Sequence, residues 1–231
     1  MRSSSPSLPA SRLGWLAPAL TLGTLTLGTL ALTASAQAQA TQYNSQASFN
    51  AATSGVTTFN FNGYAPKNIQ QYYLTGLTVD GVTFNAIDGV FVVDPGFGTG
   101  NPFSGSQYLD NPASSGPLSV ALPAGTTAFG ADFANYFSSS QATITALVNG
   151  QSFTFAAPGS FSNSSVFAGF TSTVPITSLS FSDGFGVVLD NVSIGSAIPA
   201  AVPEASTTVS FGLLALGLAG VVVAAKKKAV A

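Results

Sequence analysis

Two predicted hairpins constrain the fold of this chain more than any other feature of its sequence. Alternating runs flank an Asn-Gly pair within residues 142–155 and an Asp-Gly pair within residues 77–84. A two-residue type I′ turn requires positive φ at both central positions, which these residue types tolerate, so each pattern predicts a tight antiparallel hairpin. Alternation within the first pattern places Ile144, Phe153 and Phe155 on faces that need cover.

Short runs rich in β-branched and aromatic residues recur along residues 41–200 and predict roughly nine to eleven strands in total. The further runs are 56–61, 90–93, 118–122, 127–133, 166–170, 176–181 and 187–194. The segment 45–53 predicts a short helix or turn anchored by Phe49, and the Gly-, Pro-, Asn- and Ser-rich segment 94–117 predicts a long loop. Many short strands favour an all-β fold, an antiparallel β-sandwich that is jelly-roll-like, with the eighteen Phe of the chain available to fill it.

The N-terminal segment 1–40 has the composition of a secretory signal peptide. Arg2 and Arg12 precede an apolar stretch, and a series of Ala residues alternating with small or polar ones follows it. Small residues at positions −3 and −1 favour cleavage after Ala40, with cleavage after Ala38 as the alternative. The alternative is an N-terminal anchor that is not cleaved.

The C-terminal segment 201–231 combines a short motif, an apolar run and a basic end. Its charge-free run predicts a transmembrane helix over 207–225, which reaches most of the way across a hydrocarbon core of about 30 Å. Lysines at one end of such a run mark the cytoplasmic side, so the rest of the chain is expected outside. The motif is Val202, Pro203, Glu204 and Ala205, and the basic tail is Lys226, Lys227 and Lys228.

This order of motif, apolar run and basic end resembles the PEP-CTERM sorting signal of exported bacterial proteins. The resemblance implies that an exosortase, a membrane-embedded transpeptidase, recognises the motif and releases the protein to the cell surface or extracellular polymer. Ala205 stands where the family motif has its second proline. A tail anchor that is never cut is the alternative. Until release, the C-terminal helix holds the protein in the inner membrane with its C-terminus cytoplasmic.

The domain between these segments, 41–200, also resembles the single-domain exported proteins that carry such tails. The resemblance rests on segments such as 128–133 and 188–195, and the second of these also resembles the closing strand of jelly-roll carbohydrate-binding modules. The expected partners are therefore signal peptidase and exosortase as processing enzymes, the membrane before processing, and extracellular polysaccharide.

The composition of the domain excludes several functions. Between Thr41 and Pro203 one lysine stands against seven aspartates, so the net charge is −6, which repels nucleic acid. The chain has no His and no Cys, so Ser/His/Asp and Cys/His catalysis is not available. We therefore expect that the protein is not an enzyme. A glycoside hydrolase that uses two of Asp132, Asp183 and Asp190 is the remaining catalytic alternative. The other interpretation is that the aspartates cap turns, since Asp80 and Asp183 each precede a Gly and Asp94 precedes a Pro.

Two binding sites are predicted from residue type. Tyr72 and Tyr73, in a segment dense in amides, form a candidate sugar platform, and Tyr108 is a second candidate. The alternative is that one of the adjacent tyrosines belongs to the core.

Calcium accepts carboxylate and amide oxygens and is the one candidate cofactor. Its candidate ligands are Asp132, Asp183, Asp190 and Asn191. The alternative is that Asp190 and Asn191 bind an adjacent loop backbone. Two functions thus stay open: a structural or adhesive role in exopolysaccharide or biofilm matrix, and a carbohydrate-binding module with or without calcium.

Overall fold

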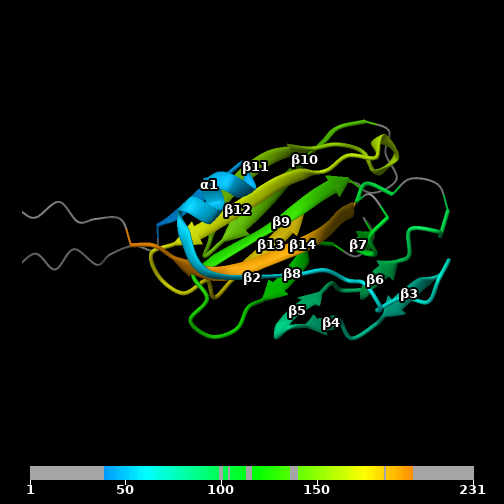
Figure 1. Cartoon of the computed structure of the whole chain (residues 1–231), viewed down its shortest axis with the longest axis horizontal. Coiled ribbons are helices and arrows are strands. Elements are labelled where there is room, and N and C mark those ends of the chain that lie inside the picture. The colour runs from blue at the N-terminus through cyan, green and yellow to red at the C-terminus, as the bar shows by residue number, and fades with distance from the viewer. Residues whose placement is uncertain are drawn as a thin grey trace, which may run out of the picture. The chain divides into compact units, whose positions relative to one another are not determined.

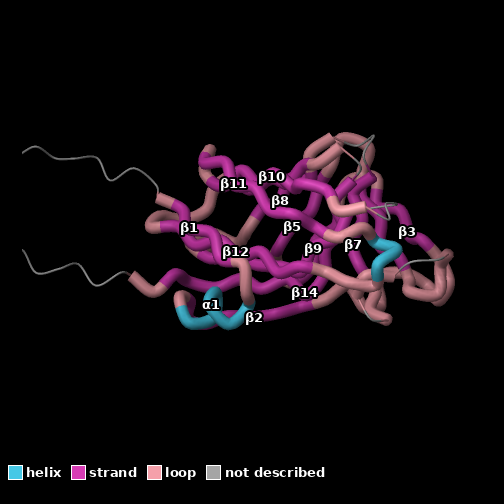
Figure 2. The backbone as a smooth tube through the Cα atoms, turned by 90° about the horizontal axis from the view of Figure 1, so that it is seen from above, coloured by secondary structure: helices cyan, strands magenta, loops and turns pink. Residues whose placement is uncertain are grey.

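Fourteen strands in two antiparallel sheets form the described part of the protein. The structure, a computed structural model, describes residues 39–98, 101–103, 105–112, 116–135, 140–184 and 186–199. The sheets pack face to face as a sandwich (Figure 1). The tube view shows strands joined by loops, with little helix (Figure 2). The all-β antiparallel sandwich expected from the sequence is therefore confirmed.

Both predicted terminal signals lie outside this description, apart from Gln39 and Ala40 at the start. The sorting motif, the predicted span 207–225 and the basic tail are all among the residues that the structure does not describe. Within the described ranges, none of the helices is long and apolar enough to cross a membrane.

One sheet has eight strands and the other has six. The order of the first is β1 (Ala40–Tyr43), β12 (Val166–Ser172), β9 (Ala128–Asn135), β14 (Gly186–Ala197), β7 (Tyr108–Pro112), β6 (Val90–Val93) and β3 (Gln70–Tyr73), with β2 (Thr53–Phe59) also paired to β14. The order of the second is β11 (Gln151–Ala157), β10 (Ala142–Val148), β13 (Leu179–Ser182), β8 (Leu118–Ala121), β5 (Val82–Asn85) and β4 (Leu77–Val79).

Both predicted hairpins are confirmed. Strands β10 and β11 pair around Asn149 and Gly150, whose φ angles are 49° and 80°. Strands β4 and β5 pair around Asp80 and Gly81, whose φ angles are 48° and 81°. Positive φ at all four positions is the signature of the type I′ turn that the two dipeptides predict.

The predicted loop 94–117 is wrong in part, because it contains β7 at Tyr108–Pro112. This strand pairs with β6 on one side and with β14 on the other. Its sequence, YLDNP, lacks the alternation that marks a half-exposed strand, because four of its five residues are buried. The short edge strands β1 and β3 also lack a clear pattern, and β13 begins at Leu179 rather than at residue 176.

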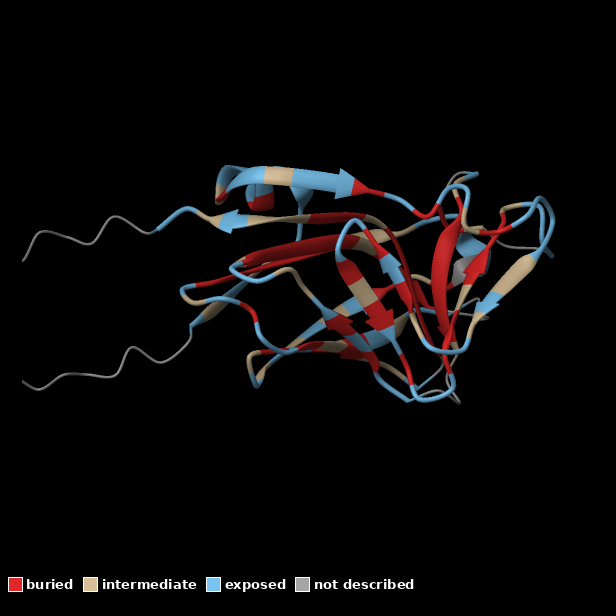
Figure 3. Ribbon diagram, turned by 90° about the horizontal axis from the view of Figure 1, so that it is seen from below, coloured by how far each residue is buried: buried red, intermediate tan, exposed pale blue. Residues whose placement is uncertain are grey.

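Aromatic side chains fill the space between the sheets. Phe129 and Phe133 of β9 pack against Phe181 of β13, with ring centroids 5.6 and 4.8 Å apart. Phe170 of β12 lies 5.6 Å from Phe153 of the opposite sheet. Buried residues lie mainly in the strands in the middle of the sandwich, and exposed ones in the loops and edge strands (Figure 3). These rings are therefore the contacts that join sheet to sheet.

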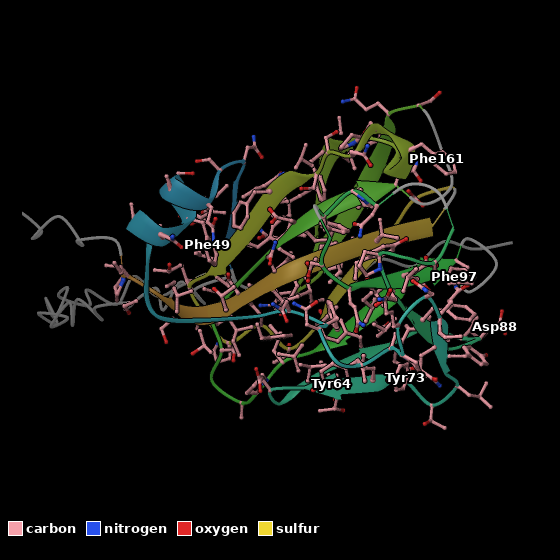
Figure 4. All side chains as sticks on the ribbon, turned by 45° about the vertical axis from the view of Figure 1, so that its right-hand side comes forward. Phe49, Tyr64, Tyr73, Asp88, Phe97 and Phe161 are labelled. Carbon is pink, nitrogen blue, oxygen red and sulfur yellow. The ribbon has the colours of Figure 1, made fainter. Side chains whose placement is uncertain are left out.

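The helix α1 (Gln46–Ala51) packs on the outer face of the eight-stranded sheet. Ser45 caps its start by accepting a hydrogen bond from the Ser48 N–H at 3.2 Å. Its single buried residue, Phe49, lies over Gly130 and Gly169, which are paired across β9 and β12. Figure 4 shows Phe49 at this end of the sandwich. The two glycines leave room for the ring, so the predicted anchor at Phe49 is confirmed.

Substitution of Gly169 by Ala is expected to lower the free energy of unfolding by about 1–3 kcal/mol, because overpacking forces the rings apart. A Cβ at this position would lie 2.5 Å from the Phe49 ring and 2.9 Å from the Phe167 ring. Urea denaturation measures the change. Gly184→Ala is the matched control, because a Cβ there meets nothing within 4 Å. Equal stability of the two variants would contradict the packing role of Phe49.

Candidate functional site

A β-bulge in β14 determines which face carries the acidic residues. Along the ladder with β9, Asp190 pairs with Asp132 and Ser193 pairs with Gly130, so β14 has one extra residue between these pairs. Asn191 takes up the extra residue with φ at 51°, a left-handed conformation that Asn tolerates better than most residues. The phase of the strand changes there: Leu189 faces the core before the bulge and Val192 after it.

Asp190 lies on the outer face of this sheet and is fully buried. Its exposure is 0 %, and neither carboxylate oxygen has a hydrogen-bond partner of normal geometry. Burial, with the nearby Asp132 charge adding to it, raises the pKa of Asp190 to about 6. The Ser106 hydroxyl and the backbone amides of Asn191 and Phe61 oppose this rise without cancelling it.

Three of the four predicted calcium ligands come together here. Asn191 Nδ2 donates to Asp132 Oδ2 at 2.9 Å, and Asp132 lies directly across from Asp190. Asp183 is separate: it lies before β14, where its Oδ1 accepts the Gly186 N–H at 2.5 Å. Gly186 and Asp190 are four positions apart along β14, which corresponds to about 13 Å. Within the described ranges, no group of three or more acidic side chains is close enough to hold a metal ion.

Two loops beside this acidic face are joined by Gln107 and Asp94. Gln107 Nε2 donates to the Ala65 carbonyl at 2.7 Å and to Asp94 Oδ2 at 2.9 Å, while its Oε1 accepts the Ala65 N–H at 3.0 Å. Asp94 Oδ1 accepts the N–H groups of Asn68 at 2.9 Å and Gly96 at 3.0 Å. The Asn68 bond first, then those from Gln107 and Gly96, hold the pKa of Asp94 below its usual range. The network fixes the loop after β2 to the loop after β6.

An exposed aromatic surface, formed by Tyr72 of β3 and Phe91 of β6, lies at the edge of the same sheet. The two rings stack with centroids 4.7 Å apart and planes 26° from parallel. The Tyr72 hydroxyl donates to the Asp88 carbonyl, and a Cβ at Gly89 would lie 2.8 Å from the Tyr72 ring. Tyr72 is thus held in place at three points while 41 % of it remains exposed.

The other two predicted sugar-binding tyrosines are placed differently. Tyr73 points to the opposite face, where its ring packs against the core and its hydroxyl donates to the Tyr64 carbonyl. Burial, with the neighbouring Tyr64 adding to it, raises the pKa of Tyr73. Tyr108 is only 4 % exposed and packs on Phe103, 5.6 Å away between centroids, so it presents no open ring face. One of the adjacent tyrosines is therefore half in the core, as the alternative interpretation held.

A shallow groove of 510 Å³ begins beside the aromatic surface. Two exposed aliphatic residues line it: Leu74, which follows β3, and Ile87, which precedes Asp88. They are 66 % and 83 % exposed. Its polar lining includes Thr75, Asn85 and Ser119. Figure 4 shows Asp88 and Phe97 at this end of the sandwich, away from Phe49. Apolar and uncharged polar groups thus meet in this groove.

Sequence reasoning missed Gln107, Asp110 and the groove. Asp110 of β7 is fully buried on the outer face of the eight-stranded sheet. It pairs with Phe91 of β6 on one side and with Val188 of β14 on the other. A single Gln or Asp in a segment rich in Gly, Pro, Asn and Ser gives no local signal of burial. Both residues owe their burial to pairing or hydrogen bonding with segments more than ten residues away. Asp94 was interpreted from sequence only as a turn residue.

The fold places this protein in the class of all-β, two-sheet antiparallel sandwiches. No family model matches the chain, and no curated protein matches it. Among solved structures, the chain is similar to an exo-β-1,3-galactanase from Phanerochaete chrysosporium in complex with galactose. The identity is 18 %, the TM-score is 0.29, and the match covers 55 % of this chain but only 29 % of the galactanase.

Substitution of Asp94 by Asn tests the loop network through pH. Because the hydrogen bonds lower its pKa, the stabilisation by Asp94 is complete above the unfolded pKa of about 4 and is lost as the pH falls through the lower folded value. We expect the stability difference between wild type and Asp94→Asn to be largest near pH 6 and to close in acid. Urea denaturation from about pH 6 to pH 2 measures it. Asp88→Asn, an exposed site, controls for the loss of one charge, and a difference independent of pH would contradict the network.

Proposed function

We propose that this chain is an exported, non-catalytic surface protein that adheres to neutral extracellular polysaccharide. The observation that carries the proposal is the Tyr72 ring, which is fixed by Phe91, Gly89 and Asp88 yet exposed at the edge of the sheet. A rigid aromatic face loses little conformational entropy on binding and suits the apolar face of a sugar ring. This proposal joins the adhesive role and the carbohydrate-binding alternative into one function.

The groove next to Tyr72 supports a chain-like ligand over a single sugar. Its exposed aliphatic residues Leu74 and Ile87 offer apolar contact, and Thr75, Asn85 and Ser119 offer uncharged hydrogen-bonding groups. A domain with one lysine has little attraction for an anionic polymer, so a neutral polysaccharide fits its charge better.

The position of this surface also suits a tethered protein. The ends of the described chain, Gln39 and Pro199, line one groove beside β1 and the end of β14. In Figure 1 that end of the sandwich lies opposite β3 and β6. In the proposal, a sorting signal and membrane helix over 201–231 hold the protein at one end, and the other end faces the matrix. The strand topology of the domain is then a variant of the jelly roll.

A second proposal concerns calcium, which would bind between Asp190 and Asp132. Asp190 is fully buried, and it receives hydrogen bonds from the Ser106 hydroxyl and the Asn191 and Phe61 amides but has no counter-charge beside it. A buried carboxylate without a counter-charge costs several kcal/mol unless it is protonated or paired. The one lysine of the domain, Lys67, lies in the loop after β2 near Asp94. Neutral oxygens such as those of Asn191 and Ser106 would complete the ligand set. The same burial argues against Asp190 as a glycosidase carboxylate, which must reach its substrate.

Tyr72→Ala is expected to weaken polysaccharide binding about five- to thirtyfold, since loss of an aromatic contact of roughly 1–2 kcal/mol has that effect. Affinity electrophoresis through gels containing β-1,3-galactan, laminarin, xylan or soluble cellulose measures it. Tyr72→Phe keeps the ring and should retain most of the binding. Leu147→Ala, an exposed change in the other sheet, is the control. Binding that is absent from all four polymers, or equal in wild type and Tyr72→Ala, would overturn the proposal.

Calcium is expected to raise the Tm of the wild type and to leave Asp190→Asn unchanged. At a free concentration about 100 times Kd the stabilisation is about 2.7 kcal/mol. Differential scanning calorimetry with calcium or with EDTA measures the shift. Asp183→Asn should keep the full response, because Asp183 lies apart from the pair. An equal response in Asp190→Asn, or none in the wild type, would contradict the calcium proposal and leave the aromatic surface untouched.

A further inference from the structure

The described domain begins earlier than one of its two predicted cleavage sites allows. Gln39 is already hydrogen-bonded to the fold: its N–H donates to Thr173 Oγ1 at 3.2 Å, and its carbonyl accepts the Thr173 N–H at 3.1 Å. Thr173 follows β12, the neighbour of β1. Residue 39 therefore extends the pairing of the edge strand rather than preceding it.

Ala40 joins the two sheets at their open edge. It is the first residue of β1 and pairs with Ser172 of β12. Its N–H donates to Oε1 of Gln151 at 2.5 Å, and Gln151 begins β11, the edge strand of the other sheet. Figure 2 shows β1 and β11 at the same end of the sandwich. The Ala40 side chain also packs against the main core.

The sequence permits both cleavage sites, although it favours the one after Ala40. Ala36-Gln37-Ala38 and Ala38-Gln39-Ala40 both supply small residues at −3 and −1. Cleavage after Ala40 would remove both Gln39 bonds and the bond to Gln151, and would leave the Gln151 oxygen without its partner. Cleavage after Ala38 keeps all three, since the new terminal amine is the Gln39 nitrogen and remains a donor to Thr173.

We infer that signal peptidase cleaves this chain after Ala38, so that the mature protein begins at Gln39. The inference depends on the export proposed above. It assigns a structural role to Gln39 and Ala40, which close the edge between β1 and β11, and it limits the leader to residues 1–38. The inference rests on the folded domain, which uses Gln39 and Ala40 and keeps both only when cleavage occurs after Ala38.

N-terminal sequencing and intact-mass measurement of the full chain, expressed in a bacterium with a general secretion system, test the inference. A terminus at Gln39 in the exported fraction supports it. A terminus at Thr41 or elsewhere overturns the inference and leaves export standing. Recovery of protein starting at Met1, with none exported, contradicts the proposed export itself.

Two leader variants sharpen this test. Ala36→Lys removes the −3 residue of the site after Ala38 but no specificity position of the site after Ala40, so it should abolish the Gln39 terminus. Ala40→Gln removes the −1 residue of the other site and should be processed normally. The reverse pattern overturns the inference.

A stability comparison provides an independent readout. Chains beginning at Gln39 and at Thr41, both complete to Ala231, are expected to differ by a few degrees in Tm, with the longer chain more stable. Equal Tm values would remove the physical reason for preferring Ala38 and overturn the inference.

Discussion

The pairing of β14 along both of its edges is the constraint on which the rest of the sandwich depends. One edge pairs with β9 over most of its length, and the other pairs first with β7 and then with β2. The bulge at Asn191 falls between the part of β14 that pairs with β7 and the part that pairs with β2. Because the bulge adds one residue, the strand keeps apolar side chains in the core on both sides of it. The same shift leaves Asp190 and Asn191 beside Asp132 on the outer face.

Burial of acidic side chains is the second theme of this protein. A domain with seven aspartates and one lysine has few ion pairs to form, so its carboxylates are satisfied mainly by amide N–H groups. Asp94 follows this rule through Asn68, Gly96 and Gln107. Asp190 also receives hydrogen bonds, from the Ser106 hydroxyl and the Asn191 and Phe61 amides, but burial still raises its pKa to about 6. A carboxyl buried in this way is either protonated or close to a cation, and the calcium titration distinguishes the two.

The aromatic surface and the chain ends occupy opposite ends of the molecule. Tyr72 and the groove lined by Leu74 and Ile87 lie with β3 and β6, whereas Gln39 and Pro199 lie with β1 and the end of β14. A tethered adhesive protein needs this separation, since a binding surface beside its anchor would face the membrane. Export, polysaccharide binding and the cleavage position are thus three proposals that agree with this separation of the aromatic surface from the chain ends, and each has its own test.

The sequence alone determined the local structure. It specified the hairpins at Asn149-Gly150 and Asp80-Gly81 and the two-sheet class, because positive φ and alternation of period two are properties of neighbouring residues. It named Tyr72, Asp132, Asp190 and Asn191, but not their arrangement. Only the tertiary structure decided that Tyr72 is exposed while Tyr108 is buried, that Asp183 lies apart, and that Gln107 and β7 have buried roles. These outcomes depend on contacts between segments distant in the chain, and no local pattern encodes such contacts.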